Sequence, residues 1–129
     1  MALTDFEVAT IHESNHSMDK ITHYREIVQR ILLPYSSHHY ANADVENEVV
    51  FDREHNHYLV MQIGWQEGIR RIHGCLLHLD IIDGKVWIQR DGTEDGIVNE
   101  LEEAGIPKSD IVPGFHPAKD RPLTGYAVA

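Results

Sequence analysis

The sequence from Ile69 to Gln89 reads Ile-Arg-Arg-Ile-His-Gly-Cys-Leu-Leu-His-Leu-Asp-Ile-Ile-Asp-Gly-Lys-Val-Trp-Ile-Gln. Asp83 and Gly84 lie between two apolar runs, and both residue types tolerate the positive φ angles of a type I′ turn. The stretch therefore predicts a β-hairpin, with one strand from about Ile69 to Ile82 and the next from Lys85 to Gln89.

The first of these strands alternates in character. The odd-numbered residues from 75 to 81 are apolar, whereas the residues between them include His78 and Asp80. Successive side chains of a strand point to opposite faces. We therefore expect the odd-numbered face, Cys75 included, to form the core.

Upstream of this hairpin, residues 46–51 and 58–65 predict two further strands, joined by the polar turn 52–57. Before them, apolar residues recur at intervals of three and four between Ser17, a suitable N-cap, and Pro34, which predicts a helix. The residues of its apolar face are Ile21, Tyr24, Ile27, Val28, Ile31, Leu32 and Tyr35.

Downstream of the hairpin, Thr93 as a cap, the acidic residues Glu94 and Asp95, and a stop at Gly105 predict a second helix. Residues 106–129 carry scattered apolar residues among prolines and glycines, so we expect them to wrap the domain as ordered loop. The expected fold class is α+β: an N-terminal helix, a four-stranded antiparallel meander sheet, a second helix and a C-terminal wrapping tail.

A chain of 129 residues has room for one core, so residues 18–129 are expected to form a single domain. Residues 1–17 have few apolar side chains and no sustained period, which favours a loosely ordered leader. A single cysteine excludes an internal disulfide framework, and the sequence shows neither a secretory signal nor a long apolar run. We therefore expect a cytoplasmic protein that is not associated with a membrane.

The charge balance restricts the function classes. The chain has 21 acidic and 11 basic side chains, a formal net charge of −10 at pH 7. Proteins that bind duplex DNA draw most of their affinity from Lys and Arg side chains that neutralise phosphates. We therefore expect no direct DNA binding, and any role on DNA would run through another protein.

Two stretches of the sequence match the residue patterns of metal-binding motifs, but the secondary structure predicted around them differs from that of the motifs. His12 and His16 fit the H-E-x-x-H pattern, although the intervening Ser14 and Asn15 are poor helix formers. An EF-hand loop would need an incoming helix where residues 85–89 predict a strand. The residues that match positions of that loop are Asp91, Thr93, Asp95, Gly96 and Glu102.

A second group of candidates is His73, His78, Asp80 and His116, whose imidazole and carboxylate groups suit metal binding or acid–base chemistry. On a regular strand His73 points away from His78 and Asp80, so these side chains are better interpreted as solvated polar groups. The weak metal candidates are His78, Asp80, Asp91 and Asp95.

The sequence contains no glycine-rich phosphate loop, serine nucleophile elbow or cysteine spacing typical of zinc. We expect no catalytic residues, no cofactor and no enzymatic activity. The basic island formed by Arg70, Arg71 and Arg90 is either part of a salt-bridged sheet edge or a contact for an acidic partner. The candidate partner-binding residues are Arg70, Arg71, His73, Arg90, Asp91, Glu94 and His116.

Several segments resemble the XisI family. They are Arg71-Ile-His-Gly-Cys, Asp83-Gly-Lys-Val-Trp-Ile-Gln-Arg-Asp-Gly-Thr-Glu, Glu103-Ala-Gly-Ile-Pro-Lys, Gly114-Phe-His-Pro and Thr124-Gly-Tyr-Ala-Val-Ala. The similarity covers about residues 18–129. It implies a cyanobacterial controlling factor for excision of the fdxN element during heterocyst differentiation, which works alongside a site-specific recombinase and a companion called XisH.

From this resemblance we expect a non-catalytic accessory factor that acts through an XisH-like protein and the recombinase. One alternative is an antitoxin-like regulator of a nuclease-like XisH partner, with acidic side chains that mimic phosphates. Another is a small ligand-binding or metal-binding domain. We also expect a homodimer, because Tyr58, Val60 and Leu76 are predicted on a sheet face that the helices leave uncovered.

Overall fold

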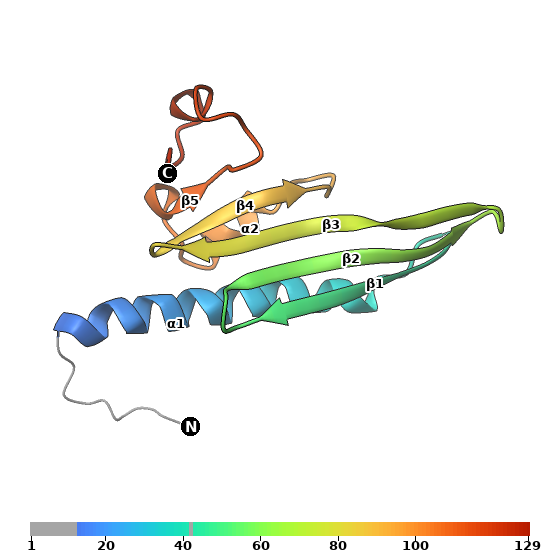
Figure 1. Cartoon of the computed structure of the whole chain (residues 1–129), viewed down its shortest axis with the longest axis horizontal. Coiled ribbons are helices and arrows are strands. Elements are labelled where there is room, and N and C mark those ends of the chain that lie inside the picture. Colours follow the sequence, from blue (N-terminus) through green and yellow to red (C-terminus); the bar gives the residue numbers. More distant parts are fainter. Residues whose placement is uncertain (1–12, 42) are drawn as a thin grey trace.

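The computed structural model describes residues 13–41 and 43–129, and side chains from residue 20 onward except residue 42. The α+β class predicted from the sequence is confirmed, with the helix α1 preceding a sheet (Figure 1). The elements in chain order are α1 (Glu13–Leu32), the 3-10 helix η1 (Leu33–Ser37), β1 (Ala43–Asp52), β2 (His57–Gln66), β3 (Arg70–Ile82), β4 (Lys85–Asp91), α2 (Val98–Glu103), η2 (Lys108–Asp110), β5 (Ile111–Val112) and η3 (Arg121–Leu123).

Helix α1 begins at Glu13, so Ser17 lies inside the helix and its prediction as the N-cap was wrong. The end of the helix agrees with the sequence, because α1 ends at Leu32, two residues before Pro34 in η1. Residues 1–12 of the predicted leader lie outside the described residues. None of the described helices is long and apolar enough to cross a membrane.

The sheet has the order β1-β2-β3-β4-β5. Its first four strands form the antiparallel meander predicted from the sequence, and the turn at Asp83 and Gly84 has φ angles of 51° and 79°. The prediction of four strands was incomplete, because Ile111 and Val112 in the tail pair in parallel with β4. Both residues are fully buried, and a two-residue strand is too short to show an alternating pattern.

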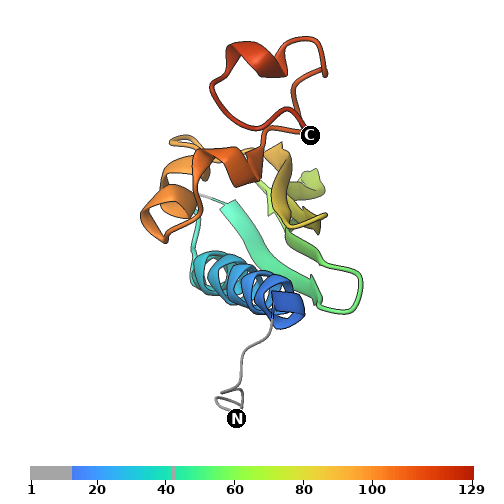
Figure 2. The ribbon, with the colours of Figure 1, turned by 90° about the vertical axis from the view of Figure 1, so that its left-hand side faces the viewer.

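Both α-helices pack on one face of the sheet, and the opposite face, which we call the open face, carries no α-helix in the described part of the chain (Figure 2). The core between helices and sheet includes Tyr58 and Val60, each fully buried. The sequence prediction that these two residues lie on an uncovered dimer face was therefore wrong. Dimerisation itself stays a prediction, now without that basis.

A bulge in β3 changes which side chains reach the core. Leu77 lies opposite Val60, but the next pair joins Cys75 to Met61, so Leu76 is an extra residue. Leu77 and its successors at 79 and 81 are buried as predicted. Cys75 is only partly buried and shares the open face with Met61, so its place in the predicted core was wrong.

Helix α2 begins later than the sequence predicts. Thr93 is not its cap, because the helix starts at Val98 and Ile97 occupies the N-cap position. The side chain of Asp91 instead accepts hydrogen bonds from the Thr93 and Ile97 backbone N–H groups, at 3.0 and 2.7 Å. These bonds hold residues 93–96 as a loop, and Gly96 in that loop has a φ angle of 82°.

Asp110 ties the tail to α1. Its carboxylate accepts a hydrogen bond from the Tyr24 hydroxyl at 2.5 Å and pairs with the Lys20 ammonium at 3.0 Å. Burial alone would raise the pKa of Asp110, but these two partners hold it below its usual value.

We expect Asp110→Asn to lower the free energy of unfolding by roughly 1–2 kcal/mol at neutral pH, because a charge-assisted contact is lost. A lowered native pKa gives stability above the unfolded pKa of about 3.9, which disappears as the pH falls through the native value. Urea denaturation between pH 3 and 7 should therefore show a shallower acid dependence in the variant. The same substitution at the exposed Asp95 is the control, and equal effects at both positions would contradict the assignment.

Candidate functional site

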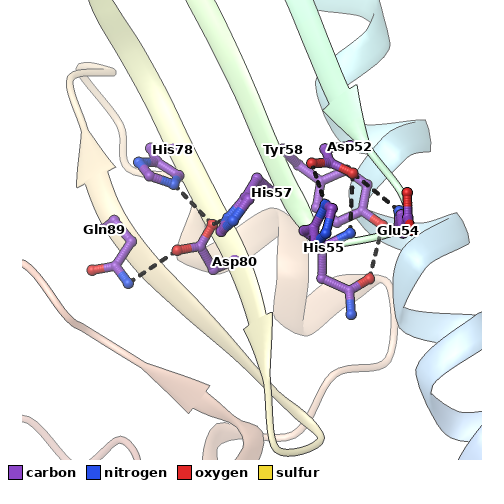
Figure 3. Close-up of polar contacts among 9 residues, drawn as sticks. Asp52, Glu54, His55, His57, Tyr58, His78, Asp80 and Gln89 are labelled. Atoms are coloured by element: carbon purple, nitrogen blue, oxygen red, sulfur yellow. Dashed lines mark hydrogen bonds and ion pairs between the residues drawn. The ribbon is translucent and has the colours of Figure 1, made fainter.

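A cluster of two histidines around one aspartate lies on the open face (Figure 3). His57 Nδ1 lies 2.7 Å from Asp80 Oδ1, and His78 Nε2 lies 2.8 Å from the same oxygen. The Gln89 amide donates a hydrogen bond to Asp80 Oδ2 at 3.2 Å. Asp80 is therefore contacted by three side chains from three adjacent strands.

The sheet register brings these residues together. His57 is the first residue of β2 and lies directly opposite Asp80, while His78 precedes Asp80 by two positions on the same face of β3. A second bulge pairs His78 with Arg90 and Leu79 with Ile88, which leaves Gln89 as the extra residue of β4.

The cluster provides hydrogen-bond partners for a buried carboxylate. The Asp80 side chain is only 9% exposed, whereas those of His57 and His78 are 51% and 30% exposed. An unpaired buried carboxylate would be costly, and here its oxygens meet polar partners. The hydrogen bond and the negative charge of Asp80 raise the pKa of His57 above its usual value. Two imidazoles beside one carboxylate suit proton exchange or metal binding.

The tail supports this cluster from the β4 side. A Cβ atom added at Gly114 would lie 2.9 Å from both Gln89 Oε1 and Trp87 Cε3, so only glycine allows the chain to pass this close. The Arg121 guanidinium lies 5.0 Å from the centre of the Trp87 ring. The tail therefore helps to hold Gln89 beside Asp80.

The other predicted candidates lie elsewhere. His73 does share the open face with His78, contrary to the prediction for a regular strand. The extra residue Leu76 in the bulge shifts the alternation of side chains, so that residues 73 and 78 point to the same face. His73 lies opposite Ile63, which is four residues along β2 from the residue that lies opposite His78. Four residues of a strand span about 13 Å, so His73 is too far away to join the cluster. His116 is exposed in the tail beside Phe115. Among the described residues, His57, His78 and Asp80 form the one group with metal-binding geometry.

His57 was not among the site residues predicted from the sequence. Its signal was the hairpin register, because the residue that opens one strand of a hairpin lies opposite the residue near the end of the next strand. The sequence predicts both strands but does not fix the register in which they pair. Asp80 was therefore predicted as a site residue without His57, the residue that lies opposite it.

The EF-hand match does not form a calcium loop. Strand β4 extends to Asp91, and both carboxylate oxygens of Asp91 accept hydrogen bonds from the loop that follows. Asp95 and Glu94 are exposed. The His12 and His16 side chains of the H-E-x-x-H pattern lie outside the side chains that the structure describes.

The predicted basic residues are separated. Arg70 and Arg71 lie where β3 begins, at the tip of the long β2–β3 hairpin, whereas Arg90 donates a hydrogen bond to the Cys75 carbonyl at 3.3 Å. Figure 1 shows that this hairpin extends well past the end of α1. We call residues 65–71 the hairpin tip.

The chain forms a small α+β domain. It has two α-helices on one face of a five-stranded mixed sheet and a histidine–aspartate cluster on the other face. Residues 18–128 match the family described as XisI protein. The chain belongs to the XisI family. No curated protein matches the sequence.

Two solved structures are similar to this chain. A XisI-like protein from Anabaena variabilis ATCC 29413 is 40% identical with a TM-score of 0.77, and the match covers 84% of this chain and 99% of that one. The fdxN element excision controlling factor XisI from the same organism is 38% identical with a TM-score of 0.73, covering 86% and 100%. The name of the second protein describes a controlling role rather than a catalytic one.

Proposed function

We propose that this chain is a non-catalytic accessory factor that controls excision of a DNA element through protein partners. The observation that carries this proposal is the family match over residues 18–128, together with the similarity to a protein named as an fdxN element excision controlling factor. The net charge of −10 supports it, because such a field opposes direct contact with DNA phosphates. The partners would be an XisH-like protein and a site-specific recombinase.

The hairpin tip is the surface that we propose for the partner. Ile69 is 81% exposed there and Trp65 is 43% exposed. The Arg71 guanidinium lies 5.2 Å from the centre of the Trp65 ring, which arranges a basic group over an aromatic one. Exposed aromatic, aliphatic and Arg side chains on a projecting hairpin are the composition of an interface centre.

We expect Ile69→Asp to weaken the complex with the XisH-like companion at least tenfold, because the substitution places a charge at the centre of the contact. Co-purification of the two proteins followed by light scattering would measure the complex, and titration calorimetry its affinity. Leu123→Asp is the matched control, since Leu123 is 85% exposed on η3, far from the tip in the sequence. Failure of the unmodified proteins to co-purify would refute the proposed function, whereas equal losses in both variants would refute only the surface.

One observation favours a second candidate function, restraint of a nuclease-like partner. Asp44, Glu46 and Glu48 are exposed and alternate along β1, so their carboxylates form a column on the open face at intervals of about 6.6 Å. Such a column can compete with phosphates for a basic surface. If this candidate is right, the partner expressed alone is toxic, this chain relieves the toxicity, and the triple variant Asp44→Asn, Glu46→Gln, Glu48→Gln does not.

A further inference from the structure

We propose that His57, His78 and Asp80 form a binding site for one divalent transition-metal ion, with zinc as the ion most suited to the donors. The three ligand atoms, one from each residue, lie within 4.8 Å of one another. Two imidazole nitrogens and a carboxylate oxygen make up a ligand set used for zinc and for non-haem iron(II). This inference does not depend on the proposed function.

The distances require a small adjustment. Ligands at 2.0–2.1 Å from a tetrahedral ion are about 3.3 Å apart. The two histidine nitrogens now lie 2.7 and 2.8 Å from Asp80 Oδ1, as hydrogen-bond partners. The metal would replace the two hydrogen-bonding protons, and each separation would grow by about half an ångström, which side-chain rotation supplies. The backbones of β2 and β3 are paired at this point and would not need to move.

Gln89 supplies the outer support that such a site needs. Its amide is bonded to Asp80 Oδ2, which orients the carboxylate so that Oδ1 faces both histidines. Groups that fix a metal ligand in this way contribute substantially to metal affinity. Gly114 packs closely against Gln89, so the cluster is held from the tail side as well.

The fourth coordination position would face away from the core. His57 and His78 are partly exposed, and the open face carries no α-helix in the described part of the chain. A water molecule or a side chain of a bound partner would complete the site. With three protein ligands we expect micromolar affinity, and the affinity should fall at low pH because protons compete with the ion for its ligand atoms.

The test uses the full chain after treatment with a chelator. Titration with ZnCl₂ by calorimetry should give one ion per chain, and CoCl₂ should give the visible bands of a four- or five-coordinate Co²⁺ site with nitrogen and oxygen ligands. His57→Ala should weaken binding at least tenfold. Since His57 is half exposed, this variant should fold normally, which near-ultraviolet circular dichroism would check.

His55→Ala is the matched control. His55 is also paired with an aspartate, Asp52, at 3.0 Å, but it is more exposed and lies outside the group of three (Figure 3). We expect it to bind zinc like the unmodified chain. The proposal is wrong if the unmodified chain binds no stoichiometric metal, or if His55→Ala and His57→Ala reduce binding equally, since scattered surface histidines would then account for it.

Discussion

Replacing Tyr58 with alanine should lower the free energy of unfolding by about 3–5 kcal/mol, the range for truncating a large buried aromatic side chain. Tyr58 is fully buried, and its ring centre lies 5.7 Å from that of Phe51. Its hydroxyl donates a hydrogen bond to Asn56 Oδ1 at 3.3 Å, so the phenol has a polar partner in the turn between β1 and β2. The alanine variant would leave a cavity and lose both contacts.

Urea denaturation at two protein concentrations would measure this effect. Substitution of a core residue shifts the unfolding midpoint equally at both concentrations, whereas substitution of a residue at a dimer interface changes how the midpoint depends on concentration. Trp65→Ala is the control, because Trp65 is 43% exposed at the hairpin tip and its loss should cost about 1 kcal/mol or less. A loss below about 1 kcal/mol in Tyr58→Ala would contradict the observed packing.

Tyr58 also shows why one face of the sheet was assigned wrongly from the sequence. Strand β2 has apolar residues on both faces, with Tyr58 and Val60 on one and Leu59 and Met61 on the other. Alternation identifies a buried face only where the opposite face is polar. In β2 both faces are apolar, so the position of α1 decided which one became the core, and that information is not local.

The features that were predicted well depend on local chemistry. The turn at Asp83 and Gly84 needed two residues that accept positive φ angles, and the sequence provides both. The bulge at Leu76 has no such signal, because an extra residue in a strand is stabilised by packing against its neighbours. One bulge was enough to move Cys75 out of the core and to bring His73 onto the face of His78.

The candidate site was half predicted for the same reason. His78 and Asp80 lie two positions apart, so their common face follows from the strand period alone. His57 and Gln89 join them across strand pairs, and the Gln89 contact depends on a second bulge. A residue pattern within one strand cannot specify that placement.

Gly64→Ala should lower the free energy of unfolding by about 2–3 kcal/mol, because the new methyl group would collide with backbone atoms that cannot rotate away. A Cβ atom at Gly64 would lie 2.0 Å from the Asp44 carbonyl oxygen and 2.7 Å from Val45 Cα. To relieve the collision, β1 must move away from β2 where residues 43–45 pair with residues 64–66. These pairs support the base of the hairpin tip.

Gly74→Ala is the control for this prediction, since Gly74 lies in β3 and a Cβ atom there meets nothing within 4 Å. Its effect should be within about 0.5 kcal/mol of zero or slightly stabilising. Hydrogen exchange would locate the damage, with faster exchange in residues 43–47 than in residues 49–52 of β1. Uniform acceleration along the whole strand would contradict a local separation. If the hairpin tip binds the partner, Gly64→Ala should also weaken the complex, because a partner then has to order a tip whose base is loose.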